Sequence, residues 1–112
     1  MASVDEFWLT DFGDPYPGEP ASSRPALVIG PPDTFGHGFP FAIVFPVTTI
    51  RRGLSLHNEI EPTMETGLEV TSYIQCELLR SISRNRLIHR LGIIGDAESL
   101  AIAQIIRTLL NY

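Results

Sequence analysis

Lysine, cysteine and long apolar runs are missing or scarce in this chain, and each absence excludes a class of protein. The single cysteine, Cys76, cannot form an intrachain disulfide, which agrees with a reducing compartment. The apolar runs are far shorter than the ~18–20 residues that span a bilayer. Residues 1–6 lack the basic-then-apolar order of a signal peptide, and no cysteine and histidine set is spaced for zinc. We therefore expect a cytoplasmic protein without a membrane segment or a structural metal.

The remaining composition favours one packed domain with a small basic surface. The 112 residues suffice for one compact domain over 1–112 and are too few for two. The hydrophobic fraction of 44% suits a packed core, and the net charge of −5 argues against broad, nonspecific binding to nucleic acid. All eight basic residues are arginines, however, and arginine suits bidentate contact with phosphate. A small basic groove on an acidic body therefore stays open.

Apolar and β-branched runs between turn residues predict five or six short strands in one barrel or curled sheet. The predicted strands are 6–12, 26–29, 41–47, 54–61, 72–76 and 87–93. Because Pro46 has no N–H group, we place it at a sheet edge or a bulge. A C-terminal helix follows, with Asp96 as its N-cap. Its apolar face contains Leu100, Ala103, Ile106, Leu109 and Leu110, widened by Ile102 and Ile105.

The stretch Ser23–Gly30 is the centre of this predicted arrangement, because it presents one arginine at the mouth of a buried strand. Pro25 holds the residue before it in an extended conformation, so Arg24 is displayed from a fixed backbone. A guanidinium fixed in this way can bind a phosphate in fork geometry. A surface arginine in an ordinary ion pair is the alternative that these residues alone leave open.

Several segments, in one order from Glu6 to Leu110, resemble the MazF/PemK family of toxins. They are Phe7-Trp8-Leu9 with Asp11-Phe12, Gly18-Glu19-Pro20, Arg24-Pro25-Ala26-Leu27-Val28-Ile29, Phe45-Pro46-Val47-Thr48-Thr49, Leu56-His57-Asn58-Glu59-Ile60, Cys76-Glu77-Leu78-Leu79-Arg80-Ser81-Ile82, and Arg86-Leu87 with Leu91-Gly92. The resemblance implies a mainly β fold with a C-terminal helix, an SH3-like small barrel of the MazF/PemK/CcdB toxin type, and a homodimer.

The resemblance also implies an activity and a partner. The activity would be that of a metal-independent endoribonuclease that needs no cofactor and cuts single-stranded RNA at a short sequence. The substrate's own 2′-hydroxyl would attack, which gives 2′,3′-cyclic phosphate and 5′-hydroxyl ends. The partner would be a cognate antitoxin whose acidic, disordered C-terminal segment blocks the RNA groove.

Arg24 and Thr48 match the family's catalytic arginine and threonine. Arg24 would stabilise charge that develops on the phosphate. The hydroxyl of Thr48, or the N–H groups of Thr48 and Thr49, would donate to a phosphate oxygen. Glu19, Glu77 and His57 are candidates for catalytic support: two acids of the matching segments and a side chain that titrates near neutrality. A solvated loop acid and a structural strand histidine are the plain alternatives for Glu19 and His57.

The RNA-binding candidates are Tyr16, Thr49, Arg51, Arg52 and Arg80. Tyr16 lies in an exposed proline-rich loop, where it can stack on a base, and the arginines can contact phosphates. Phe7, Trp8 and Phe12 could also stack on bases, but core packing is the better interpretation for two of the three. His37 and His89 are weaker candidates.

Three departures from the family pattern keep other functions open. Val4-Asp5-Glu6 stands where many members carry a basic residue, Ser23 replaces a second arginine, and Leu78 replaces a glutamine. Each change removes a polar or basic group near the expected groove. The alternatives are a noncatalytic gyrase-inhibiting toxin of the same fold and an inactive antitoxin-binding module. The pairing of Arg24 with Thr48 favours the nuclease.

Overall fold

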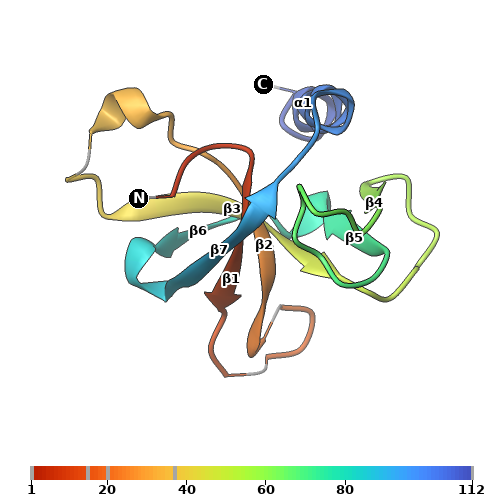
Figure 1. Cartoon of the computed structure of the whole chain (residues 1–112), viewed down its shortest axis with the longest axis horizontal. Coiled ribbons are helices and arrows are strands. Elements are labelled where there is room, and N and C mark those ends of the chain that lie inside the picture. The colour runs from red at the N-terminus through yellow and green to blue at the C-terminus, as the bar shows by residue number, and fades with distance from the viewer. Residues whose placement is uncertain (1, 15, 20, 37, 112) are drawn as a thin grey trace.

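The computed structural model describes residues 2–14, 16–19, 21–36 and 38–111, and these form a mainly antiparallel β structure with one C-terminal helix. Figure 1 shows how the strands cross near the centre of the molecule, with the helix on one side. The elements are β1 Glu6–Asp11, β2 Ser23–Gly30, β3 Phe41–Thr48, β4 His57–Ile60, β5 Ser72–Gln75, β6 Arg80–Ser83, β7 Leu87–Ile93 and α1 Asp96–Leu109, with short 3-10 turns η1 Asp33–Phe35, η2 Cys76–Leu78 and η3 Arg84–Arg86. The predicted fold class is confirmed.

Strand β3 is the central strand of the sheet, whose order is β4-β5-β3-β2-β1-β7. One side of β3 pairs with β2; on the other side its first half pairs with β6 and its last residues with β5. Pro46 lies opposite Ala26 of β2, between the β6 and β5 pairings. Its predicted place at a sheet edge or bulge is therefore wrong. The missing N–H group is tolerated because β3 has no partner there on its second side.

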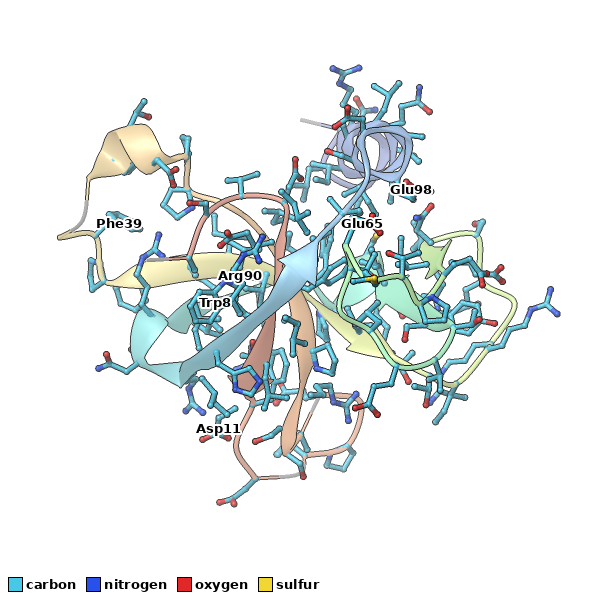
Figure 2. All side chains as sticks on the ribbon, in the orientation of Figure 1. Trp8, Asp11, Phe39, Glu65, Arg90 and Glu98 are labelled. Atoms are coloured by element: carbon cyan, nitrogen blue, oxygen red, sulfur yellow. The ribbon has the colours of Figure 1, made fainter. Side chains whose placement is uncertain are left out.

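The loop 61–71, which follows edge strand β4, closes the curled sheet by reaching edge strand β7. The N–H of Ile93 in β7 donates to the carbonyl of Glu65 at 2.7 Å. Gly92 and Gly67 allow this close approach, because a Cβ on Gly92 would overlap the backbone of Glu65 and a Cβ on Gly67 would overlap that of Leu91. Figure 2 shows Glu65 on the side of the molecule where α1 and Glu98 lie. The loop contact thus joins the two edges of the open, curled sheet.

Two apolar cores lie on opposite faces of β2 and β3, and both strands are therefore nearly continuous in apolar residues. Along β2, Ala26 and Val28 belong to one core, and Leu27 belongs to the other. This alternation is the period-two pattern of a strand buried on both faces. Phe7 and Phe12 are buried in the two cores, so the preference for core packing over base stacking is confirmed for these two side chains.

Three details of the predicted elements are wrong. Strand β4 begins only at His57, because the preceding residues turn, with the N–H of His57 donating to the carbonyl of Leu54. Strand β6 was not predicted: its four residues, Arg80–Ser83, offer too short a pattern. The N-cap of α1 is Gly95, and Asp96 is the first helical residue.

The helix α1 packs over β4 and η2 with a narrower face than its sequence predicts. Ile102 is buried in the larger core, with Ile105 and Ile106 partly buried against it. Leu100 and Leu110, two members of the predicted face, are 62% and 51% exposed. The core contact is centred on Ile102, so Leu100 lies away from it. None of the described helices is long and apolar enough to cross a membrane.

Candidate functional site

A polar groove runs across the end of the sheet where β2 begins and where β3 and β5 end. Its middle is a cavity of about 480 Å³, here called the central hollow. The central hollow is lined by Gly18, Glu19, Arg24, Arg52, Gln75, Glu77 and Leu78. Residues of the loop before β2, the start of β2 and the junction of β5 with η2 thus line one cavity, although these segments are far apart in the sequence.

Arg24 projects into this groove from the second residue of β2. Its Nε donates to the carbonyl of Ala21 at 3.2 Å, which holds the side chain over the loop before β2. The strand begins at Ser23, so Arg24 lies inside β2 and pairs with Thr10 of β1. Pro25 follows in the same strand, as expected for an extended neighbour. The predicted display of Arg24 from a fixed strand is therefore what the structure shows.

Thr48 lines a second cavity of about 430 Å³, the threonine hollow, which shares Arg24, Arg52 and Gln75 with the central hollow. Thr48 is the last residue of β3, and Thr49 lines the same hollow. The Thr48 hydroxyl oxygen accepts from the N–H of Ile50 at 3.2 Å. Within the described part of the chain this hydroxyl donates to no protein group, so its hydrogen can point into the hollow. The structure thus brings the predicted pair, Arg24 and Thr48, to one cavity.

Glu77 and His57, two candidates for catalytic support, form one partly buried hydrogen-bonded pair. His57 Nε2 lies 2.7 Å from Glu77 Oε2. The imidazole is 2% exposed, whereas the Glu77 side chain is 28% exposed and lines the central hollow. A hydrogen bond to a buried ring fixes the carboxylate relative to Arg24. His57 itself lines a separate cavity of about 310 Å³, together with Arg51.

Glu19 and Arg80 extend the groove in the other direction. They line an outer hollow of about 410 Å³, which shares Glu19, Glu77 and Leu78 with the central hollow. The Arg80 guanidinium carbon lies 5.7 Å from the centroid of the Phe12 ring, within cation–π range. This contact holds Arg80 at the mouth of the outer hollow, and Phe12 belongs to the core beneath it.

Two of the predicted RNA-binding residues, Tyr16 and Arg51, lie outside the polar groove. Tyr16 is 68% exposed and lines none of the cavities described above. Arg51 lines the side cavity with His57. His37 lies outside the described residues, and His89 is exposed on β7.

Most of the described arginines, those of the groove included, form no ion pair, and Arg90 is the exception. Within the described residues the ion pairs are His57–Glu77 and Arg90–Glu6, so the arginines of the groove have no carboxylate partner within ion-pair distance. Arg90 Nε lies 2.8 Å from Glu6, and Figure 2 shows Arg90 beside Trp8. Arg24 and Glu77 thus share one hollow without pairing, and the charge of Arg24 stays available to a ligand there.

Gln75 is a groove residue that no sequence motif predicted. It is the last residue of β5 and lies opposite His57 of β4. Among the described residues, three buried side-chain atoms have no hydrogen-bond partner: His57 Nδ1, Gln75 Oε1 and Glu77 Oε1. All three atoms belong to this one cluster. A glutamine between Ile74 and Cys76 in the predicted strand 72–76 is the signal that the sequence carries. The described chain holds no cluster of three or more His, Cys, Asp or Glu side chains suited to a metal ion.

A curled antiparallel sheet with a C-terminal helix, and a polar groove that contains an arginine and a threonine, define a small β protein with one candidate ligand site. A sequence profile of the family described as "PemK-like, MazF-like toxin of type II toxin-antitoxin system" matches residues 4–110. The chain belongs to this family.

Solved structures agree in fold over almost the whole chain. MazF from Deinococcus radiodurans superposes with a TM-score of 0.84 at 18% identity, covering 99% of this chain and 97% of that one. The Mycobacterium tuberculosis toxin MazF-mt6 gives a TM-score of 0.77 at 20% identity, covering 95% and 96%. A mycobacterial endoribonuclease in complex with its cognate antitoxin gives 0.79 at 16% identity, covering 99% and 96%. At such identities the likeness establishes the shared fold.

Proposed function

We propose that this toxin is a metal-independent, sequence-specific endoribonuclease that cleaves single-stranded RNA in the groove described above. The observation that carries the proposal is the convergence of Arg24, Thr48 and Arg52 on adjoining hollows, where neither arginine pairs with a carboxylate of the residues that the structure describes. On a chain of net charge −5, the threonine hollow is lined by Arg24 and Arg52 and, among the described residues, by no acidic side chain, which suits a phosphodiester.

In the proposed reaction the 2′-oxygen attacks the adjacent phosphorus and the bond from phosphorus to the 5′-oxygen breaks. Arg24 donates its guanidinium N–H groups to the oxygens on which negative charge develops, and Thr48 adds its free hydroxyl hydrogen. The products are a 2′,3′-cyclic phosphate and a 5′-hydroxyl. The leaving 5′-oxygen takes its proton from water that reaches the open groove.

Glu77 is the group proposed to accept the proton of the 2′-hydroxyl. Its carboxylate lies in the same hollow as Arg24, and His57 holds it from behind through the 2.7 Å hydrogen bond. A proton acceptor must lie within hydrogen-bond reach of the proton that it removes. The hydrogen bond from His57 fixes the orientation of the Glu77 carboxylate for this role. His57 acts through Glu77, since its ring is 2% exposed, and it is a positioning residue.

The test is cleavage of a long single-stranded RNA by the purified protein in EDTA. Replacing Arg24 with alanine is expected to lower the cleavage rate by about 100- to 1,000-fold, the usual loss on removing an electrostatic donor. Thr48→Ala is expected to lose less, because backbone N–H groups remain. Arg107→Ala is the matched control, since Arg107 is an exposed arginine in the last turn of α1. Equal activity of the Arg24 and Arg107 variants would refute the assignment.

We further propose that the groove is also where a cognate antitoxin binds, and that the toxin is a homodimer. One of the similar structures is an endoribonuclease with its cognate antitoxin, which supports such a partner. The unpaired arginines of the groove would attract an acidic, disordered segment in competition with RNA. An acidic peptide encoded beside the toxin should then inhibit cleavage competitively, and light scattering should give twice the monomer mass. Noncompetitive inhibition would place the antitoxin elsewhere.

A further inference from the structure

Gln75 lies at the junction of the central and threonine hollows. It lines both of them, as do Arg24 and Arg52, and it is the uncharged member of that group. Its side chain comes from the last residue of β5, so a strand fixes its backbone. Gln75 is 6% exposed, which leaves its carboxamide only the floor of the groove to face.

Within the residues that the structure describes, the fold makes no use of the side-chain oxygen of Gln75. Oε1 is buried and accepts no hydrogen bond from the residues that the structure describes. Ile74 and Cys76, its neighbours in the chain, are fully buried apolar side chains of the larger core. A leucine at position 75 would fill this place without leaving a buried acceptor unpaired, whereas an unpaired buried acceptor lowers stability. The carboxamide is therefore better explained by a ligand than by folding.

The chemistry of the carboxamide indicates which part of an RNA it binds. An amide side chain presents an acceptor and a donor side by side, whereas a phosphate presents acceptors alone. The two arginines that share the hollows with Gln75 are complementary to phosphate. The carboxamide is complementary to the edge of an unstacked base, where a donor and an acceptor are adjacent.

We propose that Gln75 is a specificity-determining residue, which hydrogen-bonds the edge of one nucleobase beside the phosphate that Arg24 and Arg52 hold. This inference rests on the proposed binding of RNA in the groove. It assigns the arginines to the backbone and Gln75 to the base. Changing an arginine should therefore weaken all sequences alike, whereas changing Gln75 should alter the preference at one position.

Binding selection with random heptamers of 2′-fluoro RNA tests the assignment separately from cleavage, because fluorine replaces the attacking hydroxyl. The full chain is compared with Gln75→Leu, Gln75→Glu and Arg52→Ala. Wild type is expected to prefer one base at one position by about 5- to 100-fold, the range for a bidentate contact. Gln75→Leu should lose that preference and keep the others. Gln75→Glu, whose carboxylate can only accept hydrogen bonds, should shift the preference toward bases that present N–H donors. Arg52→Ala should lower the affinity for every sequence by a similar factor.

The assignment is overturned if Gln75→Leu gives the wild-type profile, or if it weakens all sequences as Arg52→Ala does. Circular dichroism shows whether each variant folds. If Gln75→Leu does not fold, the nearly isosteric Gln75→Glu decides, and an unchanged profile there overturns the proposal. If the wild type leaves unmodified RNA uncut but selects a base, and Gln75→Leu loses that selection, the nuclease is refuted and the role of Gln75 is supported. A wild type that binds no RNA refutes both.

Discussion

Replacing Gly92 with alanine tests the loop contact that closes the sheet. Gly92 is buried in β7 opposite Phe7 of β1, and the loop 61–71 passes directly over it. An added Cβ would overlap the carbonyl oxygen of Glu65 and the backbone of Thr66. Because both obstacles are backbone, neither can swing away as a flexible side chain would. The loop must therefore move off β7, or β7 must shift within the sheet.

The expected loss of stability has two parts. Forcing an extra carbon into a packed place costs about 1–3 kcal/mol. The hydrogen bond from the N–H of Ile93 to the carbonyl of Glu65, 2.7 Å long, would lengthen or break. Its loss costs about 0.5–1.5 kcal/mol more. A total of about 2–4 kcal/mol corresponds to a fall in Tm of roughly 8–20 °C for a domain of this size.

Thermal and urea unfolding followed by circular dichroism measure this loss. Gly38→Ala is the matched control, because a Cβ on Gly38 would meet nothing within 4 Å. Its Tm should equal that of wild type or rise slightly, since alanine restricts the unfolded chain. If Gly92→Ala unfolds within about 2 °C of Gly38→Ala, then the loop does not close the sheet as described.

Two further predictions concern titratable groups. Burial, with the nearby Glu77 carboxylate adding to it, raises the pKa of the Cys76 thiol to about 12. Cys76 should resist a disulfide reagent at pH 8 until urea is added, and the stability it contributes should decline above its ordinary pKa of 9.0; rapid native labelling would contradict this. Burial alone would raise the pKa of Glu6, but hydrogen bonds from Ser3, Trp8 and Arg90 outweigh it and lower that pKa. The resulting stability is present above the ordinary value of 4.5 and is lost as pH falls through the folded value, so Glu6→Gln should flatten the acid side of the stability profile.

Local pattern was enough to predict most strands, whereas the pairing of Arg24 with Thr48 was predicted from the resemblance to the MazF/PemK family. Pro25 before an apolar run placed Arg24 on a strand, and β-branched residues placed Thr48 at a strand end. The start of β4 could not be predicted, because the residues before His57 keep a strand-like alternation although they turn. Strand β6 is defined by its pairing with β3. A pattern of four residues is too short to predict such a tertiary contact.

The remaining features of the site depend on tertiary contacts, which cannot be predicted from the sequence pattern. The pairing of His57 with Glu77 requires the β4–β5 register and the 3-10 turn that follows β5. Gln75 is a polar residue at the end of an apolar strand, and its place between two hollows depends on where β2 and β3 end. Leu100 is exposed because of the way α1 packs on the core. The apolar face of a helix can be wider than the part of it that contacts the core.

The most direct test of the central claim is an RNA that carries a single 2′-deoxyribose at a mapped cleavage position. The account predicts that cutting stops at this position and continues at unmodified sites, because the attacking 2′-oxygen is absent there. Products from the unmodified sites should end in 2′,3′-cyclic phosphate and 5′-hydroxyl, in EDTA as well. Cutting at the deoxyribose, or products with 5′-phosphate ends, would contradict attack by the 2′-hydroxyl in the Arg24–Thr48 groove. An intact RNA throughout would refute the nuclease and direct attention to a gyrase supercoiling assay.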